Sequence, residues 1–409
     1  MPEKKQKRCW VITELYAPDD AATAHLMTQI AEYLTVGMEV RAICAQPTYT
    51  NRGQRAPTKE TLNGVVVTRC WSTTFSKDRL ALRLVNVATI MVSFFFNMLF
   101  RFRRGDVVLV VTNPPPLPFA ALLVAKIRFA KTCLLIHDIY PDVLVPIGMT
   151  AEKSFAYRII NFFTRGLYLR CSRIIAIGRD MKDRVVAKSE RLESKTTVIA
   201  NWADKNLSVV SKEQNPLLEE LPFKGKFIIQ YSGNMGRTHG LSVIADAASI
   251  LEADGFTDVH WMICGWGAGK PKFKAKCEEL ELKSVSIHDP FPRDQLANLI
   301  GVADASIIAF IEGMSGISVP SRMYNILASG CPIIGVTESD SELAQTITDD
   351  DLGWLSPPED PESLAKLVKQ ILSDPTQADD RRARCREIAT KKFCRESMLE
   401  KYRELLDAI

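Results

Sequence analysis

The chain has 409 residues, of which 46% are hydrophobic and 24% charged, a composition typical of a globular protein of about two domains. This excludes wholesale disorder, collagen and coiled-coil architectures. The ten cysteines are scattered without a CxxC pair and the five histidines do not cluster, so we expect buried thiols in a reducing compartment, no disulfide scaffold and no metal site. The formal net charge is +4, but ten Lys/Arg against two Asp between Arg69 and Lys131 give that stretch +8.

The N-terminal residues are basic and lead into an apolar stretch too short for a signal peptide, which predicts a cytoplasmic protein. Short apolar runs then alternate with helix-length amphipathic segments. In the first half we expect strands at 9–15, 40–44, 65–70, 107–112, 133–137, 173–177 and 197–199, and helices at 25–35, 79–103, 118–129, 155–169 and 180–188.

The pattern lapses between 206 and 224, where the sequence is polar and aperiodic, and we predict a linker there. Alternation then restarts, with strands expected at 227–232, 260–264, 305–310 and 332–336, and helices at 241–252, 293–302, 321–328, 341–347, 361–372 and 396–406. This order predicts an α/β protein with two doubly wound, Rossmann-like parallel-sheet domains, residues 1–205 and 225–390, and a C-terminal helical segment, 391–409, that crosses back to the first domain. Ligands of such folds bind at the carboxyl ends of the strands, so a crevice between the two domains is expected to hold the site.

Two glycine-rich loops follow predicted strands of the second half. In YSGNMGRTHGL, from Tyr231 to Leu241, the glycines and the helix start suit an anion, although taken alone the loop is read more simply as a tight turn without a ligand. In ICGWGAGK the glycines lack the spacing of the dinucleotide fingerprint, and a flexible turn is the simpler interpretation.

A third loop, FIEGMSGISVPSRMYNILASG, gives the sharpest signal. Ser318 and Ser321 are candidate caps of the helix that follows, and Arg322 lies in its first turn. A cation there opposes the helix dipole, so its presence favours an anion shared between Arg322 and the backbone amides. A second helix start follows near Glu342, and together they predict a diphosphate site.

His137 and Asp138 end a predicted strand of the first half in LIHDIYPDV. They suit a catalytic or sugar-contacting role, and a structural His–Asp pair is the alternative. The loop from Tyr16 to His25 follows the first strand and offers further amides.

With these motifs in order, the chain resembles the retaining glycosyltransferases of family four, which have the GT-B fold, and in particular the branch that builds O-antigen and capsular polysaccharides. The resemblance covers nearly the whole length and is carried by ELYAPD, TNPPPLP, HDIYPDV, VIANWAD, YSGNMGRTHGL, ICGWG, SVPSRMYNILASGCPIIGV and DSELA.

The resemblance implies transfer of a sugar, with retained configuration, from a nucleotide diphosphate donor, expected to be a UDP-sugar, to a lipid-linked (polyprenyl) or polysaccharide acceptor, without a metal or cofactor. Catalysis is assigned to His137, Asp138 and Arg322. Donor binding is assigned to Asn234, Gly236, Arg237, His239, Gly265, Ser318, Val319, Ser321, Asn325 and Glu342.

The chain departs from the family pattern in two places. Many members carry paired glutamates where this chain has Ile317 and Asn325, and an Arg and a Lys where it has Asn234 and His239. Two alternatives therefore stay open. One is a nucleotide-sugar epimerase of the same fold, and the other is a non-catalytic nucleotide-binding subunit.

The stretch from Leu84 to Phe100 has 17 residues without a charge, and basic residues flank it. A membrane span needs about 20 apolar residues, so an interfacial helix on an anionic membrane is favoured over a span or a buried core helix. Nucleic acid is the rival partner for a basic stretch, but no nucleic-acid motif accompanies it. We expect peripheral attachment to the inner face of the cell membrane through Arg79, Arg83, Phe94, Phe95, Arg101, Arg103 and Arg104.

Overall fold

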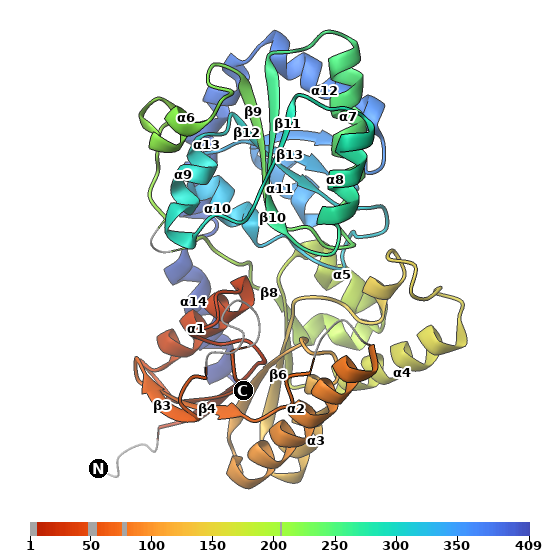
Figure 1. The fold of residues 1–409 in the computed structure, drawn as a ribbon. Helices are drawn as coiled ribbons and strands as arrows, with labels where there is room; N and C mark the ends of the chain where they lie inside the picture. Colours follow the sequence, from red (N-terminus) through yellow and green to blue (C-terminus); the bar gives the residue numbers. More distant parts are fainter. Residues whose placement is uncertain (1–5, 48–54, 76–79, 205–206) are drawn as a thin grey trace. The chain divides into compact units, whose positions relative to one another are not determined.

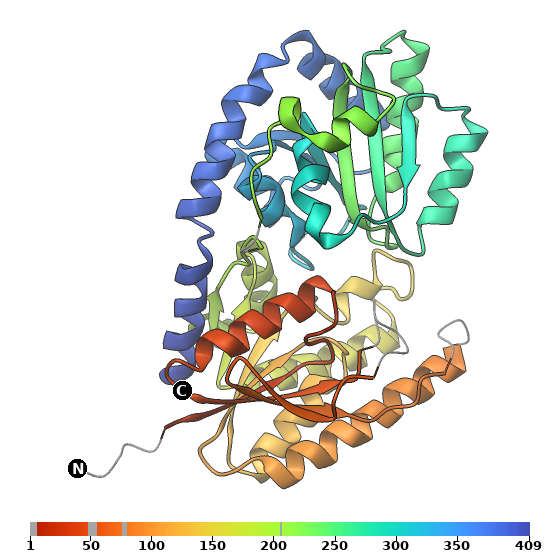
Figure 2. The same ribbon diagram turned by 60° about the vertical axis from the view of Figure 1, so that its left-hand side comes forward.

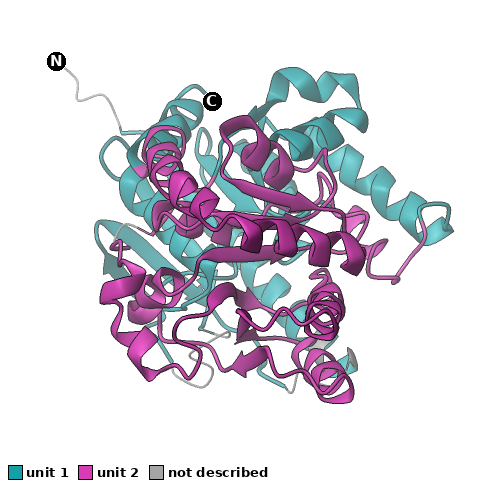
Figure 3. Cartoon of the chain, turned by 90° about the horizontal axis from the view of Figure 1, so that it is seen from above, with its two compact units in different colours: residues 1–141, 152–200, 396–409 teal, residues 142–151, 201–395 magenta. Residues whose placement is uncertain are grey.

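The computed structural model describes residues 6–47, 55–75, 80–204 and 207–409. It divides into two compact units, coloured separately in Figure 3. Unit 1 comprises residues 1–141, 152–200 and 396–409, and unit 2 comprises residues 142–151 and 201–395. Each unit is a sheet with helices packed against it (Figures 1 and 2).

Unit 1 contains a sheet in the order β3-β4-β2-β1-β5-β6-β7-β8, parallel except where β3 pairs antiparallel with β4. Its strands are β1 (Arg8–Ile12), β2 (Glu39–Ala45), β3 (Lys59–Leu62), β4 (Val65–Cys70), β5 (Val107–Val111), β6 (Lys131–Ile136), β7 (Arg173–Ala176) and β8 (Thr196–Val198). Its helices are α1 (Ala22–Leu34), α2 (Leu80–Arg101), α3 (Leu117–Ile127), α4 (Phe155–Arg170), α5 (Arg179–Ala187) and α14 (Arg395–Asp407), with a 3-10 turn, η2 (Glu190–Lys195).

The unit 1 sheet is covered on both faces, with α1 and α2 on opposite sides of it (Figure 2). This explains the near-continuous apolar strands: all five residues of β5 are buried. The C-terminal helix α14 packs on the same unit, where the Tyr33 hydroxyl donates to Glu400 at 3.0 Å and Lys7 donates to the carbonyls of Leu406 and Asp407.

Unit 2 contains a parallel sheet in the order β11-β10-β9-β12-β13-β14, the doubly wound arrangement in which the order reverses between β9 and β12. Its strands are β9 (Phe227–Asn234), β10 (Val259–Trp266), β11 (Val285–His288), β12 (Ala305–Ala309), β13 (Ile333–Val336) and β14 (Gly353–Ser356). Its helices are α6 (Pro216–Glu220), α7 (Leu241–Ala253), α8 (Lys270–Glu279), α9 (Leu296–Gly301), α10 (Arg322–Ala328), α11 (Glu342–Asp350), α12 (Pro361–Ser373) and α13 (Thr376–Lys391), with 3-10 turns η1 (Asp142–Leu144), η3 (Lys212–Gln214) and η4 (Arg293–Gln295).

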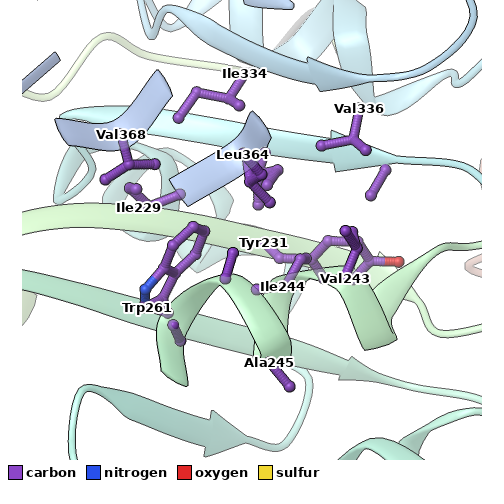
Figure 4. Close-up of a cluster of buried hydrophobic side chains, with 14 of the residues drawn as sticks. Ile229, Tyr231, Val243, Ile244, Ala245, Trp261, Ile334, Val336, Leu364 and Val368 are labelled. Carbon is purple, nitrogen blue, oxygen red and sulfur yellow. The ribbon is translucent and has the colours of Figure 1, made fainter. Parts of the chain in front are cut away.

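The main core of unit 2 lies between its sheet and the helices α7 and α12 (Figure 4). Trp261 of β10 and Ile229 of β9 meet Leu364 and Val368 of α12 there, and all four side chains are buried. This packing fixes the carboxyl ends of β9 and β10 and the start of α7, the region that holds half of the predicted donor-binding residues.

Several elements escaped the sequence prediction. Helices α8 and α13 are rich in charged residues and bury few side chains, so they lack apolar periodicity. The stretch predicted as a linker contains η3 and α6 and belongs to unit 2. There Leu218 and Phe223 are buried against Ile228 and Met262, a cluster that only the tertiary structure brings together.

Candidate functional site

Arg322 is the centre of the site in unit 2. As the first residue of α10 it reaches back to β9, where its Nη1 donates to the Ser232 carbonyl at 3.2 Å and its guanidinium carbon lies 4.4 Å from the centre of the Tyr231 ring. Its Nη2 is buried and has no hydrogen-bond partner in the described part of the chain. A buried N–H donor without an acceptor is costly, and an anion at the carboxyl end of β9 would satisfy it.

Ser321 precedes Arg322 but makes no side-chain cap, contrary to the expectation from sequence, because its own backbone is already helical. Ser318 is half-buried and Val319 is buried in the same loop. Glu338, which sequence reasoning missed, holds this loop from the neighbouring strand by accepting the backbone N–H of Ser315 at 2.8 Å. Its signal in the sequence is an acid two residues past the end of β13.

His239 lies against the same tyrosine ring as Arg322. Its Nδ1 accepts the Gly236 N–H at 3.2 Å, and its ring lies 5.7 Å from the Phe310 ring and 6.5 Å from the Tyr231 ring. Burial lowers the pKa of His239 to about 3, and the nearby charge of Arg322 adds to this effect. The imidazole is therefore neutral near pH 7, and with Nδ1 accepting, the ring proton is placed on Nε2.

The glycines of these loops permit backbone contacts that a side chain would block. A Cβ on Gly240 would stand 2.8 Å from the Phe310 carbonyl oxygen, and one on Gly265 would stand 2.0 Å from the Gly233 oxygen. The end of β9 thus packs directly on the backbone of β10, and the loop after β9 packs on the segment after β12. This close packing holds His239 beside Arg322.

A cavity of about 730 Å³ lies at the start of α7, entirely within unit 2. Three predicted donor-binding residues, Gly236, Arg237 and His239, share it with Lys272 of α8. Arg237 is exposed, as is Asn234 at the end of β9. The remaining lining is mixed in charge and polarity, including Asp246 and Glu359 as well as Leu241 and Phe273.

Asn325 and Glu342 both have partners inside the unit. The Asn325 Oδ1 accepts the backbone N–H of Asp204 at 2.8 Å, and the Asp204 carboxylate in turn accepts two hydrogen bonds from Arg293, at 2.7 and 2.9 Å. Glu342 starts α11, is buried and accepts the Thr346 hydroxyl at 3.2 Å. Asn325 therefore anchors the segment that enters unit 2.

His137 and Asp138 follow β6 in unit 1. Their backbone amides both point at the Thr112 hydroxyl, at 3.0 and 3.4 Å, which fixes this turn. The His137 Nε2 is buried and has no partner among the described residues, and burial lowers the pKa of this histidine to about 4. His137 is therefore a neutral imidazole near pH 7, and its Nε2 is unpaired within the described ranges.

The residues predicted to face a membrane behave differently from one another. Phe94 is fully buried in unit 1, so that prediction is wrong: helix α2 turns this residue towards the sheet. Phe95 and Arg101 are half-buried, and Arg103 and Arg104 are exposed. Arg79 and the side chain of Arg83 lie outside the described residues.

Comparison with known proteins identifies the family. Residues 214–392 match the family model of the glycosyl transferases group 1, and residues 21–202 match that of the glycosyl transferase 4-like domain. A probable glycosyltransferase of Pseudomonas aeruginosa, WbjE, is 32% identical over 299 residues, which are 72% of this chain and 73% of that protein. The putative colanic acid biosynthesis glycosyl transferase WcaI of Escherichia coli is 25% identical over 401 residues, 95% and 96% of the two chains.

The fold agrees with these sequence relatives. The Anabaena protein HepE, solved in complex with UDP and glucose, superposes with a TM-score of 0.75 at 13% identity, over 99% of this chain and all of that one. Its likeness shows the fold, two Rossmann-like α/β domains of the GT-B type, as the sequence predicted. The chain thus belongs to the group 1 glycosyl transferases, and it is a glycosyltransferase of the GT-B fold.

Proposed function

We propose that this enzyme transfers a sugar, with retention of configuration, from a UDP-sugar to a lipid-linked or polysaccharide acceptor. The observation that carries the donor class is the buried Nη2 of Arg322, which has no hydrogen-bond partner among the residues that the structure describes. Two oxygens of a diphosphate suit the planar fork of a guanidinium, and such charge-assisted hydrogen bonds are about twice as strong as neutral ones.

The choice of uridine is supported by HepE, which was solved with UDP and glucose. The polysaccharide acceptor is supported by the name of WcaI, which refers to colanic acid biosynthesis. Retention rests on the resemblance to the family-four enzymes. A lipid-linked acceptor fits a protein with an exposed apolar and basic surface, which is argued below.

Departure of the nucleoside diphosphate places negative charge on its phosphate oxygens, and the protein accelerates this step by stabilising that charge. Arg322 supplies the cation. His239, neutral and with its proton on Nε2, supplies an uncharged donor where many relatives have a lysine. Because Arg322 is held by Ser232 and Tyr231 before any ligand binds, little reorganisation accompanies bond cleavage.

Thermal unfolding with UDP, GDP, CDP or NAD, on the wild type, Arg322→Ala and Arg322→Lys, tests the donor site. A ligand at about 100 times its dissociation constant adds about 2.7 kcal/mol of stability. We expect UDP to raise the Tm of the wild type, to act weakly on Arg322→Lys, which keeps the charge without the fork, and to act least on Arg322→Ala. Failure of every nucleoside diphosphate to stabilise the wild type would overturn the donor site.

Turnover distinguishes the alternatives. UDP release from a UDP-sugar that requires an added acceptor supports transfer, whereas conversion of the donor sugar without an acceptor identifies an epimerase. Binding of UDP with neither reaction identifies a non-catalytic subunit. His137→Ala and Asp138→Asn, assayed for transfer with UDP affinity as the control, test the catalytic roles that the resemblance assigns to these residues.

A further inference from the structure

Helix α2 is apolar on two opposite sides. One stripe, Ile90, Phe94 and Met98, is buried in unit 1. The other, which includes Val92, Phe96 and Phe100, is exposed, with Phe100 76% accessible. A surface helix of a soluble domain normally turns a polar side outward, so the second stripe calls for a partner.

Two more helices continue this apolar surface. Helix α3 packs against both α2 and α4, and the three lie beside one another in unit 1 (Figure 1). Phe119, Leu123 and Ile127 of α3 are exposed at a spacing of four residues. On α4, Phe155 and Ile159 are exposed at the same spacing of four residues, and Ile160, Phe162 and Phe163 are exposed as well. Most of the large hydrophobic side chains that the structure leaves exposed therefore lie on these helices and their flanks.

The charge on these helices has one sign. Within their bounds α2, α3 and α4 contain no Asp or Glu, and their charged residues are Arg83, Arg101, Lys126, Arg158, Arg165 and Arg170. Arg103 and Arg104 follow α2 directly and are exposed, and the Arg104 guanidinium lies 5.9 Å from the Phe129 ring. Apolar side chains interleaved with cations, without anions, match the boundary between head groups and acyl chains of an anionic bilayer.

Helix α2 is also long and apolar enough to cross a membrane, judged by length and composition alone. It is fixed to the domain, however, by its buried stripe and by Asn86, whose side chain bonds the backbone N–H and carbonyl of Phe75 and the Thr73 hydroxyl. A helix held in this way can lie along a bilayer surface without leaving the unit 1 core, whereas spanning would expose Phe94 and Met98.

We propose that the exposed side chains of α2, α3 and α4 form one surface that docks unit 1 onto an anionic lipid bilayer. This inference adds to the sequence prediction the helices α3 and α4 and replaces Phe94 by Phe96 and Phe100. It deepens the proposed function, because a lipid-linked acceptor would be reached from the bilayer surface. Only that link to the acceptor rests on the proposed function. The docking surface itself is inferred from the exposed residues.

Vesicle flotation of the full-length protein tests this surface, with phosphatidylcholine vesicles and with vesicles in which phosphatidylglycerol replaces part of the lipid. The wild type should bind the anionic vesicles and lose binding in high salt. Each of Phe155→Ser/Phe162→Ser/Phe163→Ser and Arg103→Gln/Arg104→Gln should reduce partitioning by about tenfold or more. Matched controls are Val36→Ser/Val209→Ser and Lys274→Gln/Lys391→Gln, which remove exposed apolar or basic groups elsewhere.

Absence of binding by the wild type, or equal loss in variants and controls, would overturn the docking surface. A concentration-dependent dimer that the α4 substitutions dissolve would overturn it too, since a second copy would then cover this face. UDP-induced stabilisation is measured on every variant. If the wild type binds UDP but not vesicles, the docking surface is wrong and the donor proposal stands. If it binds vesicles but no nucleotide stabilises it, the donor proposal is wrong and the docking surface stands.

Discussion

The Arg322 guanidinium lies over the ring of Tyr231, with 4.4 Å between its carbon and the ring centre. Tyr231 itself is fully buried in the core of unit 2 (Figure 4), and its hydroxyl donates to the Asn234 carbonyl at 2.7 Å. Tyr231 therefore contacts the guanidinium through its ring and holds the end of β9 through its hydroxyl. This relationship makes Tyr231 a positioning residue for Arg322.

Tyr231→Leu should weaken UDP binding by about 2- to 30-fold, because a cation–aromatic contact contributes about 0.5–2 kcal/mol. Tyr231→Phe is the matched control: it keeps the ring and loses only the bond to Asn234, so we expect UDP affinity close to that of the wild type. Calorimetric titration with UDP measures both. Equal losses of UDP affinity in the two variants would mean that the hydroxyl bond to Asn234 matters, and not the contact between the ring and Arg322.

Gly240→Ala should lower both stability and UDP affinity. The added Cβ would stand 2.8 Å from the Phe310 oxygen, and such overpacking costs about 1–3 kcal/mol. The start of α7 would have to move away from the segment after β12, which separates His239 from Arg322. Gly255→Ala is the control, because this glycine has a φ of +79° but no neighbour within 4 Å. It should cost about 1 kcal/mol of stability through backbone strain and leave UDP affinity unchanged.

The stability that His239 contributes should fall in mild acid. Burial lowers the pKa of His239 from 6.5 to about 3, so below about pH 6.5 the unfolded chain takes up a proton that the folded chain does not. Stability is thus retained above this pH and is lost at up to about 1.4 kcal/mol per pH unit as the pH falls towards 3. His239→Gln, which is neutral throughout, should lack this loss.

Urea unfolding at pH 7.5 and pH 5 measures the effect. The free energy of unfolding of His239→Gln, relative to that of the wild type, should rise by up to about 2 kcal/mol between pH 7.5 and pH 5. A difference between the two proteins that stays constant with pH would show that His239 is protonated in the folded state.

Asn325→Ala should destabilise unit 2 by about 1 kcal/mol, because it leaves the partly buried backbone N–H of Asp204 without its acceptor. Asn325→Asp retains an acceptor oxygen and should keep most of that stability. Urea unfolding compares the two, and UDP titration supplies the second readout. A loss of UDP affinity in Asn325→Asp without a loss of stability would mean that the donor lies against this side chain, because the substitution removes the amide N–H donor and adds a negative charge.

The two Rossmann-like domains follow from the sequence because their signal is local. Buried parallel strands such as Val107–Val111 are apolar throughout, and the helices between them carry an apolar stripe that any 11-residue window reveals. Helix α13 lacks such a stripe, since few of its side chains are buried, and was missed for that reason. The same local pattern predicts from the sequence that Arg322 lies at the start of a helix that follows a strand.

The contacts of those residues were decided by tertiary structure. Arg322 meets Ser232 across 90 residues of sequence, and Asn325 meets Asp204 across 121, distances at which no spacing pattern operates. The uncharged run of α2 likewise gives no polar side from which to read its orientation, so packing against the sheet alone determines that Phe94 is buried and Phe96 exposed. The sequence by itself thus determined the elements and the kinds of chemistry available to them. Which side chains meet, and which remain without a partner, was settled by the packing of β9, β12 and α10 in unit 2 and of α2 on unit 1.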